Sequence, residues 1–363
     1  MNEKKSINYF FDELLKNKSI TDISFNGTNF YVQDNKIGRY KLDCDFDKED
    51  IENYIKQMTY SNNEQFNDEN PILDTEYPNI RINAVHKSIS SYGMTTSLRS
   101  SKPTLIENFD KEMAPKELFS FLDACIKAKL NIIISGITGA GKTELQKYLV
   151  GSIKDNEKII IIEDTLDTHI KEIYKDKDIF SWKTNTKLEK EITFDDLIKA
   201  GLRNNPDWII ISETRGKEAY SMLKSILSGH NIITTIHSND CKSSIERIIH
   251  LSKEHNNLDQ TLIGNMATDL FDIGIHLNQE ETKAGVKRGI VEVVEYTGYD
   301  EKGAVVNPLF SISSLVKKED EDYSYTDIYN YGKISEKLFN KFARKKALNK
   351  NIEMFLKEEY YEK

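Results

Sequence analysis

The sequence is poor in cysteine and proline, with three and six of them in 363 residues, and it has no long apolar run. Cys44, Cys125 and Cys241 are far apart, so no two have the spacing of a disulfide framework or a zinc site. We therefore expect three reduced, buried thiols. The longest apolar stretches, such as "IIII" at 159–162, are far shorter than the roughly 20 residues that a membrane-spanning helix needs. The sequence predicts a globular protein without a membrane span.

An excess of basic residues is also lacking. Fifty Lys and Arg stand against 59 Asp and Glu, which gives a formal net charge of -9. Duplex binding draws its affinity from many Lys and Arg contacts to phosphate. We therefore expect no direct nucleic-acid binding, although a local basic groove is compatible with this total. Near the start of the chain, Asp12 and Glu13 interrupt the apolar residues that a secretory signal requires, which predicts a cytoplasmic protein.

Two domains are expected from the length, and the sequence pattern changes along the chain accordingly. Residues 1–110 contain short alternating strands separated by turns, as in "TDISFNGTNFYVQDNKIGRYKL", and predict a small α+β domain. The segment 100–115 combines two prolines with charges and predicts the linker. From Lys116, short all-apolar strands alternate with amphipathic helices, which predicts a parallel sheet covered on both faces. We expect this α/β domain to span 111–310.

The last part of the chain, 311–363, is predicted to be a helical appendage. Beyond about residue 285 we expect a short antiparallel addition, then an acidic turn and a helical tail. The tail segment "KISEKLFNKFARKKALNK" has seven basic residues against one acid, with its apolar residues close to helical spacing. Such a helix can lie on an anionic membrane, but it more often buries its apolar stripe against its own domain. The apolar residues are Ile334, Leu338, Phe342 and Leu348.

The segment "GITGAGKT", which begins at Gly136, follows the apolar run "NIIIS" and precedes an amphipathic helix. Gly136, Gly139 and Gly141 can adopt backbone angles that are closed to other residues, so that successive N–H groups close on a polyphosphate. The start of the helix adds a positive terminus. Lys142 can reach the β and γ phosphates, and the Thr143 hydroxyl can bind Mg²⁺. A glycine-rich turn without a ligand is the alternative, and the strand and helix on either side argue against it.

We therefore predict an ATP site with Mg²⁺ at this loop. The expected nucleotide contacts within the loop are Gly136, Thr138, Gly139, Ala140, Gly141, Lys142, Thr143 and Glu144.

Acidic residues end two further apolar strands, "IIIIED" and "DWIIISE". Hydrolysis needs a carboxylate to orient the attacking water and positive charge for the phosphates. Glu163, with Asp164, and Glu213 are predicted to lie at the carboxyl edge of the sheet, where ligands of open α/β sheets bind. They could instead cap helices or face solvent. His230 and His237 flank the strand "IITTI"; either could be a core residue, but His237 follows the Glu213 strand and can sense phosphate.

Four motifs in order resemble those of the type II/IV secretion and pilus ATPases, also called traffic ATPases. They are "GITGAGKT", "IIIIEDT", "LRNNPDWIIISETRGKEA" and "GHNIITTIHS". The resemblance covers about 115–250 strongly, and the N-terminal half and the segments "FDIGIHL" and "GIVEVVEYTGY" more weakly. It implies a PAS-like N-terminal domain joined to a RecA-like P-loop motor domain, a homo-hexameric ring, and ATP bound between two lobes whose closure is the power stroke.

The resemblance also implies roles for individual residues. Lys142 and Thr143 would hold phosphate and Mg²⁺. Glu163 and Glu213 would share the water-activating and metal-orienting work, partly through water. His237 would report the γ-phosphate.

Three arginines extend this implied site. Arg81 and Arg99 match N-terminal-domain arginines that reach the phosphates across the lobes, and Arg215 matches one close to the site; simple surface solvation is the alternative for each. Two positions depart from the family pattern. Ser212 stands where glycine is usual before the acid and could crowd the nucleotide, and Glu144 replaces a small or hydroxyl residue, with a side chain expected to point away from the ligand.

The branch of the family is suggested by cysteine usage and by the "EDT" variant of the acidic box. Three scattered cysteines cannot build the four-cysteine zinc module of many type II secretion and pilus-assembly members. The sequence therefore predicts an ATP hydrolase that powers a type IV secretion apparatus, in particular a conjugative one. It would act with inner-membrane channel proteins, peripherally on the cytoplasmic face of the membrane. The alternatives are a type IV or tight-adherence pilus motor, a RecA-like nucleic-acid translocase, and a nucleotide-binding scaffold without turnover.

Overall fold

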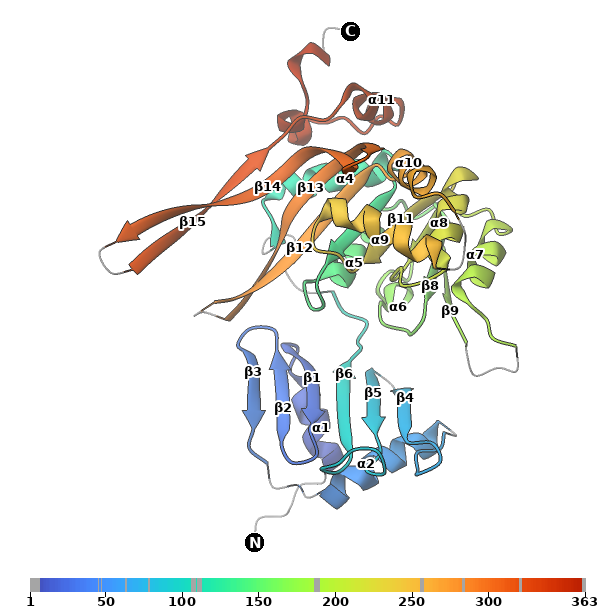
Figure 1. Ribbon diagram of the computed structural model, residues 1–363, viewed down its shortest axis with the longest axis vertical. Coiled ribbons are helices and arrows are strands. Elements are labelled where there is room, and N and C mark those ends of the chain that lie inside the picture. The colour runs from blue at the N-terminus through green and yellow to red at the C-terminus, as the bar shows by residue number, and fades with distance from the viewer. Residues whose placement is uncertain are drawn as a thin grey trace. The chain divides into compact units, whose positions relative to one another are not determined.

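The computed structural model describes most of the chain, and the described residues form two compact units (Figure 1). The first unit consists of Met1–Pro103 with Glu280–Lys287, and the second of Thr104–Gln279 with Arg288–Lys363. Parts of the predicted linker and of the predicted acidic turn lie outside the described residues. The described residues are 7–44, 46, 48–62, 64–77, 79–105, 109, 113–185, 190–254, 258–282, 285–319 and 322–360.

The N-terminal unit is built around a six-stranded antiparallel sheet with strand order β3-β2-β1-β6-β5-β4. Burial alternates along β2, where Phe30 and Val32 are buried between partly exposed neighbours, as a sheet with one covered face requires. Phe11 and Tyr54 of the two helices pack with ring centroids 5.0 Å apart. The predicted small α+β domain is confirmed. Its elements are α1 (Ile7–Lys16), β1 (Ile20–Phe25), β2 (Phe30–Asp34), β3 (Gly38–Leu42), α2 (Lys48–Ser61), β4 (Ile72–Tyr77), β5 (Ile80–Val85) and β6 (Thr95–Ser100).

The second unit contains a nine-stranded sheet with strand order β15-β14-β13-β12-β7-β11-β10-β8-β9. The strands from β12 to β9 in this order pair in parallel, as predicted. The elements are α4 (Lys116–Lys127), β7 (Ile132–Gly136), α5 (Lys142–Gly151), β8 (Ile159–Glu163), α6 (Ile170–Ile173), β9 (Ile179–Lys183), α7 (Phe194–Leu202), β10 (Trp208–Ile211), α8 (Glu218–Leu227), β11 (Asn231–Ile236), α9 (Cys241–Lys253), α10 (Gln260–Leu270), β12 (Ile273–Thr282), β13 (Gly285–Asp300), β14 (Gly303–Glu319), β15 (Asp322–Tyr331), α11 (Glu336–Arg344) and the 3-10 helices Lys350–Phe355 and Glu358–Tyr360.

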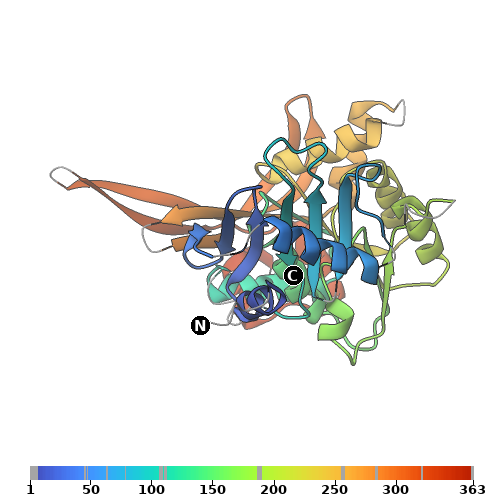
Figure 2. The same ribbon diagram turned by 90° about the horizontal axis from the view of Figure 1, so that it is seen from below.

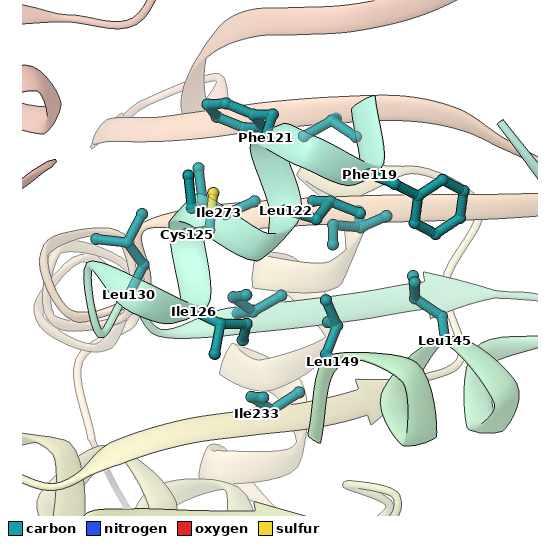
Figure 3. Packing of buried hydrophobic residues seen from close by; sticks show 14 of the residues in the cluster. Phe119, Phe121, Leu122, Cys125, Ile126, Leu130, Leu145, Leu149, Ile233 and Ile273 are labelled. Carbon is teal, nitrogen blue, oxygen red and sulfur yellow. The ribbon is translucent and has the colours of Figure 1, made fainter. Parts of the chain in front are cut away.

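Two hydrophobic cores lie on opposite faces of the parallel strands. Side chains alternate between faces along β7, so that Ile132 and Ile134 enter one core and Ile133 enters the other. The first core holds α4 and α5, and Figure 3 shows Phe121 and Leu149 among its side chains. The second core holds residues of α7, α8, α9 and α10. Both faces of the sheet are therefore covered, which explains why its strands are apolar without alternation.

None of the three cysteines forms a disulfide. Cys125 and Cys241 are fully buried, and burial raises the pKa of both thiols. The expectation that all three are buried is wrong for Cys44, which is only partly covered. Within the described residues, none of the helices is long and apolar enough to cross a membrane.

The antiparallel addition is longer than predicted. β13, β14 and β15 comprise 16, 17 and 10 residues, and the chain after Ser311 continues as strand as far as Glu319. β13 pairs with β14 only as far as Ser311, and β14 and β15 continue as a two-stranded ribbon. Figure 2 shows this ribbon projecting well beyond the rest of its unit.

The C-terminal tail folds onto the second unit through the apolar stripe that the sequence predicts. Ile334, Leu338 and Phe342 are each at most 1% exposed, and the Phe342 ring stacks on Phe121 with centroids 5.8 Å apart. The Lys341 ammonium also lies 2.5 Å from the Asp272 carboxylate. The more ordinary of the two expectations for this helix is therefore confirmed. The helical appendage predicted for 311–363 is wrong for its first part, which contains the end of β14 and all of β15. The division into 1–110, 111–310 and 311–363 remains a prediction, since by compactness the tail belongs to the same unit as the parallel sheet.

Candidate functional site

The candidate site lies at the carboxyl edge of the parallel strands, where the loop from β7 to α5 begins. Gly136 ends β7, and Gly141 is the N-cap of α5. The loop glycines have positive φ angles of 148° at Gly136, 82° at Gly139 and 99° at Gly141, a region that L side chains rarely adopt. The sequence therefore forms the strand, glycine loop and helix terminus that phosphate binding requires.

The glycines are needed for space as well as for conformation. A Cβ at Gly136 would lie 2.4 Å from the Leu277 carbonyl oxygen, and one at Gly141 would lie 3.1 Å from Met113 Cε. The loop thus packs closely against β12 on one side. These features fit a triphosphate, because at the three glycines no side chain stands between the backbone N–H groups and a ligand.

Lys142 is the central cation of this loop, and its side chain is buried. Its Nζ donates hydrogen bonds to the carbonyl oxygens of Gly136 at 2.8 Å and Ile137 at 3.0 Å, and it lies 3.3 Å from His237 Nδ1. Burial lowers the pKa of Lys142 to about 8, against the opposing effect of Glu213. Glu213 offsets the positive charge of the Lys142 ammonium only in part, and a bound phosphate would supply further negative charge.

A chain of polar contacts continues from Lys142 across the strand ends. His237, after β11, places Nε2 3.2 Å from Glu213 Oε1, and Glu213 Oε2 accepts a hydrogen bond from Arg215 Nη2 at 2.8 Å. Arg215 Nη1 donates to Asp164 Oδ2 at 2.6 Å. The structure therefore brings together four of the residues predicted from separate motifs, Lys142, His237, Glu213 and Arg215, and joins them to Asp164, which was predicted at the same edge of the sheet.

The electrostatics of this chain keep Glu213 ionised. Burial by itself would raise the pKa of Glu213, but the hydrogen bond and charge of Arg215, with His237 and Lys142, outweigh it and lower the pKa. The pKa of Arg215 is raised by its hydrogen bond to Glu213. Burial and the charge of Lys142 lower the pKa of His237, so its ring is neutral near pH 7. An ionised carboxylate beside a neutral imidazole can accept a hydrogen bond from water.

Glu163 lies elsewhere at the same edge of the sheet. It is 1% exposed, and its Oε1 accepts hydrogen bonds from the backbone N–H groups of Thr168 at 2.9 Å and Asp167 at 3.3 Å. Burial raises the pKa of Glu163 to about 7. In the sheet β11 and β10 separate β8 from β7, which places the two strands about 14 Å apart at the usual strand spacing. The structure therefore does not bring Glu163 to Lys142 as it brings Glu213, and its catalytic and metal roles remain predictions.

The other predicted loop residues follow the course of the chain. Ala140 is fully buried, and Thr143 lies in the first turn of α5. The Glu144 carboxylate lies 2.8 Å from Lys147 Nζ. The expectation that the Glu144 side chain points away from the ligand stays a prediction. Contacts of Thr138, Ala140, Thr143 and Glu144 with a nucleotide remain predictions.

Ser212, the departure from the family pattern, follows β10 directly. Its N–H donates to the Ile162 carbonyl oxygen at 3.0 Å, and its carbonyl oxygen accepts from Thr235 Oγ1 at 2.6 Å. Its own Oγ is buried and has no hydrogen-bond partner within the described residues. The backbone at this position is thus fixed by its neighbours on both sides.

Arg81 and Arg99 lie in the N-terminal unit and are register partners on the adjacent strands β5 and β6. Directly opposed residues share one face of a sheet, so both guanidinium groups belong to the same row. Asp74 pairs with Arg81 at 3.1 Å, and Asp22 pairs with Arg99 at 2.9 Å. Their juxtaposition could not be seen from the sequence. Whether they reach a phosphate remains a prediction.

Sequence reasoning missed two residues that contact the phosphate loop, Gln279 of β12 and Arg288 of β13. Gln279 Nε2 donates to the Thr138 carbonyl oxygen at 3.3 Å, and Arg288 Nε donates to the Gly139 carbonyl oxygen at 2.7 Å. Both lie more than 130 residues from the loop in the chain, and no motif marks them.

Magnesium fits the loop as an ion that phosphate oxygens and a protein group bind together. Within the described part of the chain, no three His, Cys, Asp or Glu side chains are grouped to hold a metal ion by themselves. Mg²⁺ at nucleotide sites is usually bound by one or two protein groups, phosphate oxygens and water. The Thr143 hydroxyl, at the start of α5, is the protein group that would hold it here.

Comparison with known proteins supports the family resemblance of the four sequence motifs. Residues 70–335 match the family described as Type II/IV secretion system protein. An uncharacterized protein of Bacillus anthracis is 36% identical over 293 residues, which cover 79% of this chain and 63% of that protein. The type IV secretion system protein VirB11 of Bartonella quintana is 34% identical over 172 residues, covering 46% of this chain and 48% of VirB11. The chain thus spans between about half and two thirds of the length of these relatives.

A solved structure shows the same fold. The Legionella pneumophila ATPase DotB matches with a TM-score of 0.59 at 18% sequence identity, covering 81% of this chain and 82% of DotB. The predicted fold, a RecA-like motor domain with a smaller N-terminal domain, is therefore confirmed. The chain belongs to the type II/IV secretion ATPase family and is most similar to its type IV secretion branch.

Proposed function

We propose that this protein hydrolyses ATP and uses the reaction to move its two units relative to each other in a type IV secretion apparatus. The observation that carries the proposal is the continuous chain of Lys142, His237, Glu213 and Arg215 at the mouth of the glycine loop. A loop alone would account for binding. An ionised carboxylate linked to the loop lysine through a histidine supplies what hydrolysis needs in addition.

The residues divide the reaction between binding and water activation. The loop N–H groups and Lys142 hold the phosphates, and Lys142 exchanges the carbonyl oxygens of Gly136 and Ile137 for phosphate oxygens. Glu213 orients the attacking water by accepting its hydrogen bond. Arg215 fixes the Glu213 carboxylate, and His237 lies between that carboxylate and the lysine. Mg²⁺, when bound, neutralises phosphate charge.

The wider assembly is part of the proposal. We propose a homo-hexameric ring that acts peripherally on the cytoplasmic face of the membrane with inner-membrane channel proteins, in conjugative transfer of DNA or protein. Arg81 and Arg99 would contribute positive charge to the phosphates from the N-terminal unit. Their side-by-side register supports this, since two guanidinium groups on one face suit a polyanion. A pilus assembly or retraction motor is the second candidate, supported by the family assignment alone.

Hydrolysis of ATP by purified variants tests the proposal. We expect Lys142→Ala and Glu213→Gln to lower the rate of phosphate release about 100-fold or more, because each removes a charge aimed at the reacting groups. Lys317→Ala, an exposed lysine on the ribbon, is the matched control and should keep the parent rate. Parent rates in both site variants would refute the assignment.

The same assay separates the two acids and the two arginines. Glu163→Gln should leave more activity than Glu213→Gln, because Glu163 binds its own loop rather than the Lys142 chain. Arg99→Ala and Arg81→Ala should lower hydrolysis if the charges of these arginines act on the phosphates.

Sedimentation of the protein with a non-hydrolysable ATP analogue tests the assembly of the ring independently. Monomers at saturating nucleotide would contradict the hexamer.

A further inference from the structure

The carbonyl oxygens of the glycine loop divide into two groups with opposite hydrogen-bond partners. Those of Gly136 and Ile137 accept from Lys142 Nζ, the cation that the proposed function assigns to phosphate binding. Those of Thr138 and Gly139 accept from Gln279 and Arg288, on β12 and β13. The loop is therefore held from two sides, and a nucleotide would compete for only one of them.

The contact on the strand side is a close fit. A Cβ at Gly139 would lie 3.1 Å from Gln279 Oε1, so the amide group covers this glycine directly. Arg288 is half-buried, and burial lowers the pKa of its guanidinium. The 2.7 Å hydrogen bond from Arg288 Nε to the Gly139 carbonyl oxygen is short and has a charged donor, which makes it stronger than a neutral one.

These contacts set the direction of the loop peptides. In a phosphate-binding loop the N–H groups face the ligand, so the carbonyl oxygens of the same peptides must point away and find donors of their own. Gln279 and Arg288 supply such donors at Thr138 and Gly139. Lys142 does not serve as such a donor, because its ammonium leaves the loop carbonyl oxygens when it binds a phosphate.

We propose that Arg288 and Gln279 are positioning residues that hold the glycine loop in its nucleotide-binding conformation, and that Arg288 thereby sets the affinity for ATP. The inference deepens the proposed function and rests on it. Neither residue lies in the Lys142 and Glu213 chain, so their contribution falls on binding rather than on the chemical step.

The test compares binding and turnover in four variants, Arg288→Ala, Arg288→Lys, Gln279→Ala and the control Lys317→Ala. Binding of a fluorescent ADP analogue with Mg²⁺ gives Kd, and steady-state hydrolysis gives kcat and KM. We expect Arg288→Ala to raise Kd and KM about 10-fold to 100-fold, the range of one hydrogen bond to a charged group. The kcat should stay within about threefold of the parent, since the loop still closes on saturating nucleotide.

If Arg288→Ala proves unstable in a thermal melt, Arg288→Lys and Gln279→Ala still test the proposal. Lysine keeps the charge but not the planar fork, so Arg288→Lys should recover part of the affinity, and Gln279→Ala should lose less than Arg288→Ala. Parent Kd and KM in Arg288→Ala and Gln279→Ala, or a loss of kcat with Kd unchanged, would overturn the inference. Failure of the proposed function is distinct, because then Lys142→Ala would hydrolyse ATP at the parent rate.

Discussion

At the scale of single residues, the site is a line of titratable groups, from Lys142 to Arg215, in which each changes the pKa of the next. Lys142 is buried with little counter-charge, while Glu213 is held ionised by Arg215. The imidazole of His237 connects the two, with Nδ1 toward the lysine and Nε2 toward the carboxylate. The most sensitive group is the lysine, since its pKa of about 8 lies close to neutral pH.

Nucleotide affinity should therefore fall as the pH rises above about 8. Below that pH Lys142 is already protonated in the unbound protein, and affinity is constant. Above it the unbound lysine loses its proton, and a phosphate, which favours the charged form, must bind together with a proton. We expect Kd to rise up to about tenfold per pH unit above 8, which titration with a fluorescent nucleotide between pH 7 and 9.5 measures.

Lys142→Arg provides the control for this pH dependence, because arginine stays protonated throughout the range. Its affinity is expected to be weaker overall but flat with pH. An equally steep rise of Kd in Lys142→Arg would assign the titration to another group.

Glu163 gives a second pH dependence, this time of stability. Its folded pKa of about 7 is raised above the unfolded value of 4.5, so the native state loses stability as the pH rises from about 4.5 through 7. Glu163→Gln removes the buried charge and keeps an oxygen for the Thr168 N–H. The melting temperature of Glu163→Gln relative to the parent should therefore be higher at pH 8 than at pH 5. A difference that is the same at both pH values would contradict the buried-charge explanation.

Much of this site could be predicted from the sequence because its groups sit next to recognisable strands. Gly136 to Thr143, Glu213 and His237 each border an apolar run, and strand ends of a parallel sheet meet at one edge. The order of the strands could not be predicted, and it decides that β11 rather than β8 adjoins β7. Glu163 therefore lies away from Lys142, and Arg288 reaches Gly139 without any local pattern to indicate it.

At the scale of elements, the C-terminal part shows that tertiary contacts decide which apolar side chains are buried. The sequence after Ser311 forms a ribbon whose Leu315, Val316 and Tyr325 are 45%, 51% and 69% exposed. In α11, by contrast, the apolar stripe is fully covered. The helix N-terminus is fixed as well, since the buried Glu295 carboxylate accepts a hydrogen bond from the Ser335 N–H at 3.0 Å. Helical periodicity predicted the second case, but alternation was too weak to predict the first.

The tail helix should therefore contribute to stability much more than the ribbon does. Phe342→Ala removes a ring that is fully buried against Phe121 and should lower the free energy of unfolding by about 3–5 kcal/mol. Tyr325→Ala, an aromatic truncation on the exposed ribbon, should change it by less than about 0.5 kcal/mol. Urea denaturation of the two variants measures the difference. Similar losses in both would mean that the tail does not pack as described.

At the scale of the whole molecule, β12 and β13 are shared by the two compact units. Their middle segment, Glu280–Lys287, belongs to the N-terminal unit, while the rest of both strands belongs to the unit with the glycine loop. Each unit has a hydrophobic core of its own. The proposed motion of the two units requires separate cores of this kind.

The net charge of -9 also belongs to this scale, and it bears on the choice between a secretion motor and a nucleic-acid translocase. Translocases on single strands rely on a basic path and on counterion release, so their activity is stimulated by DNA and the stimulation weakens with salt. We expect single-stranded DNA to change ATP hydrolysis by less than about twofold at both 50 and 200 mM salt, concentrations across which phosphate-dependent binding weakens strongly. A parallel sample contains vesicles with anionic lipids in place of DNA, because the exposed lysines of the tail could bind any polyanion. Stimulation by DNA alone that disappears at the higher salt would favour the translocase, because a net negative molecule shows that behaviour only if a basic path has been built into it.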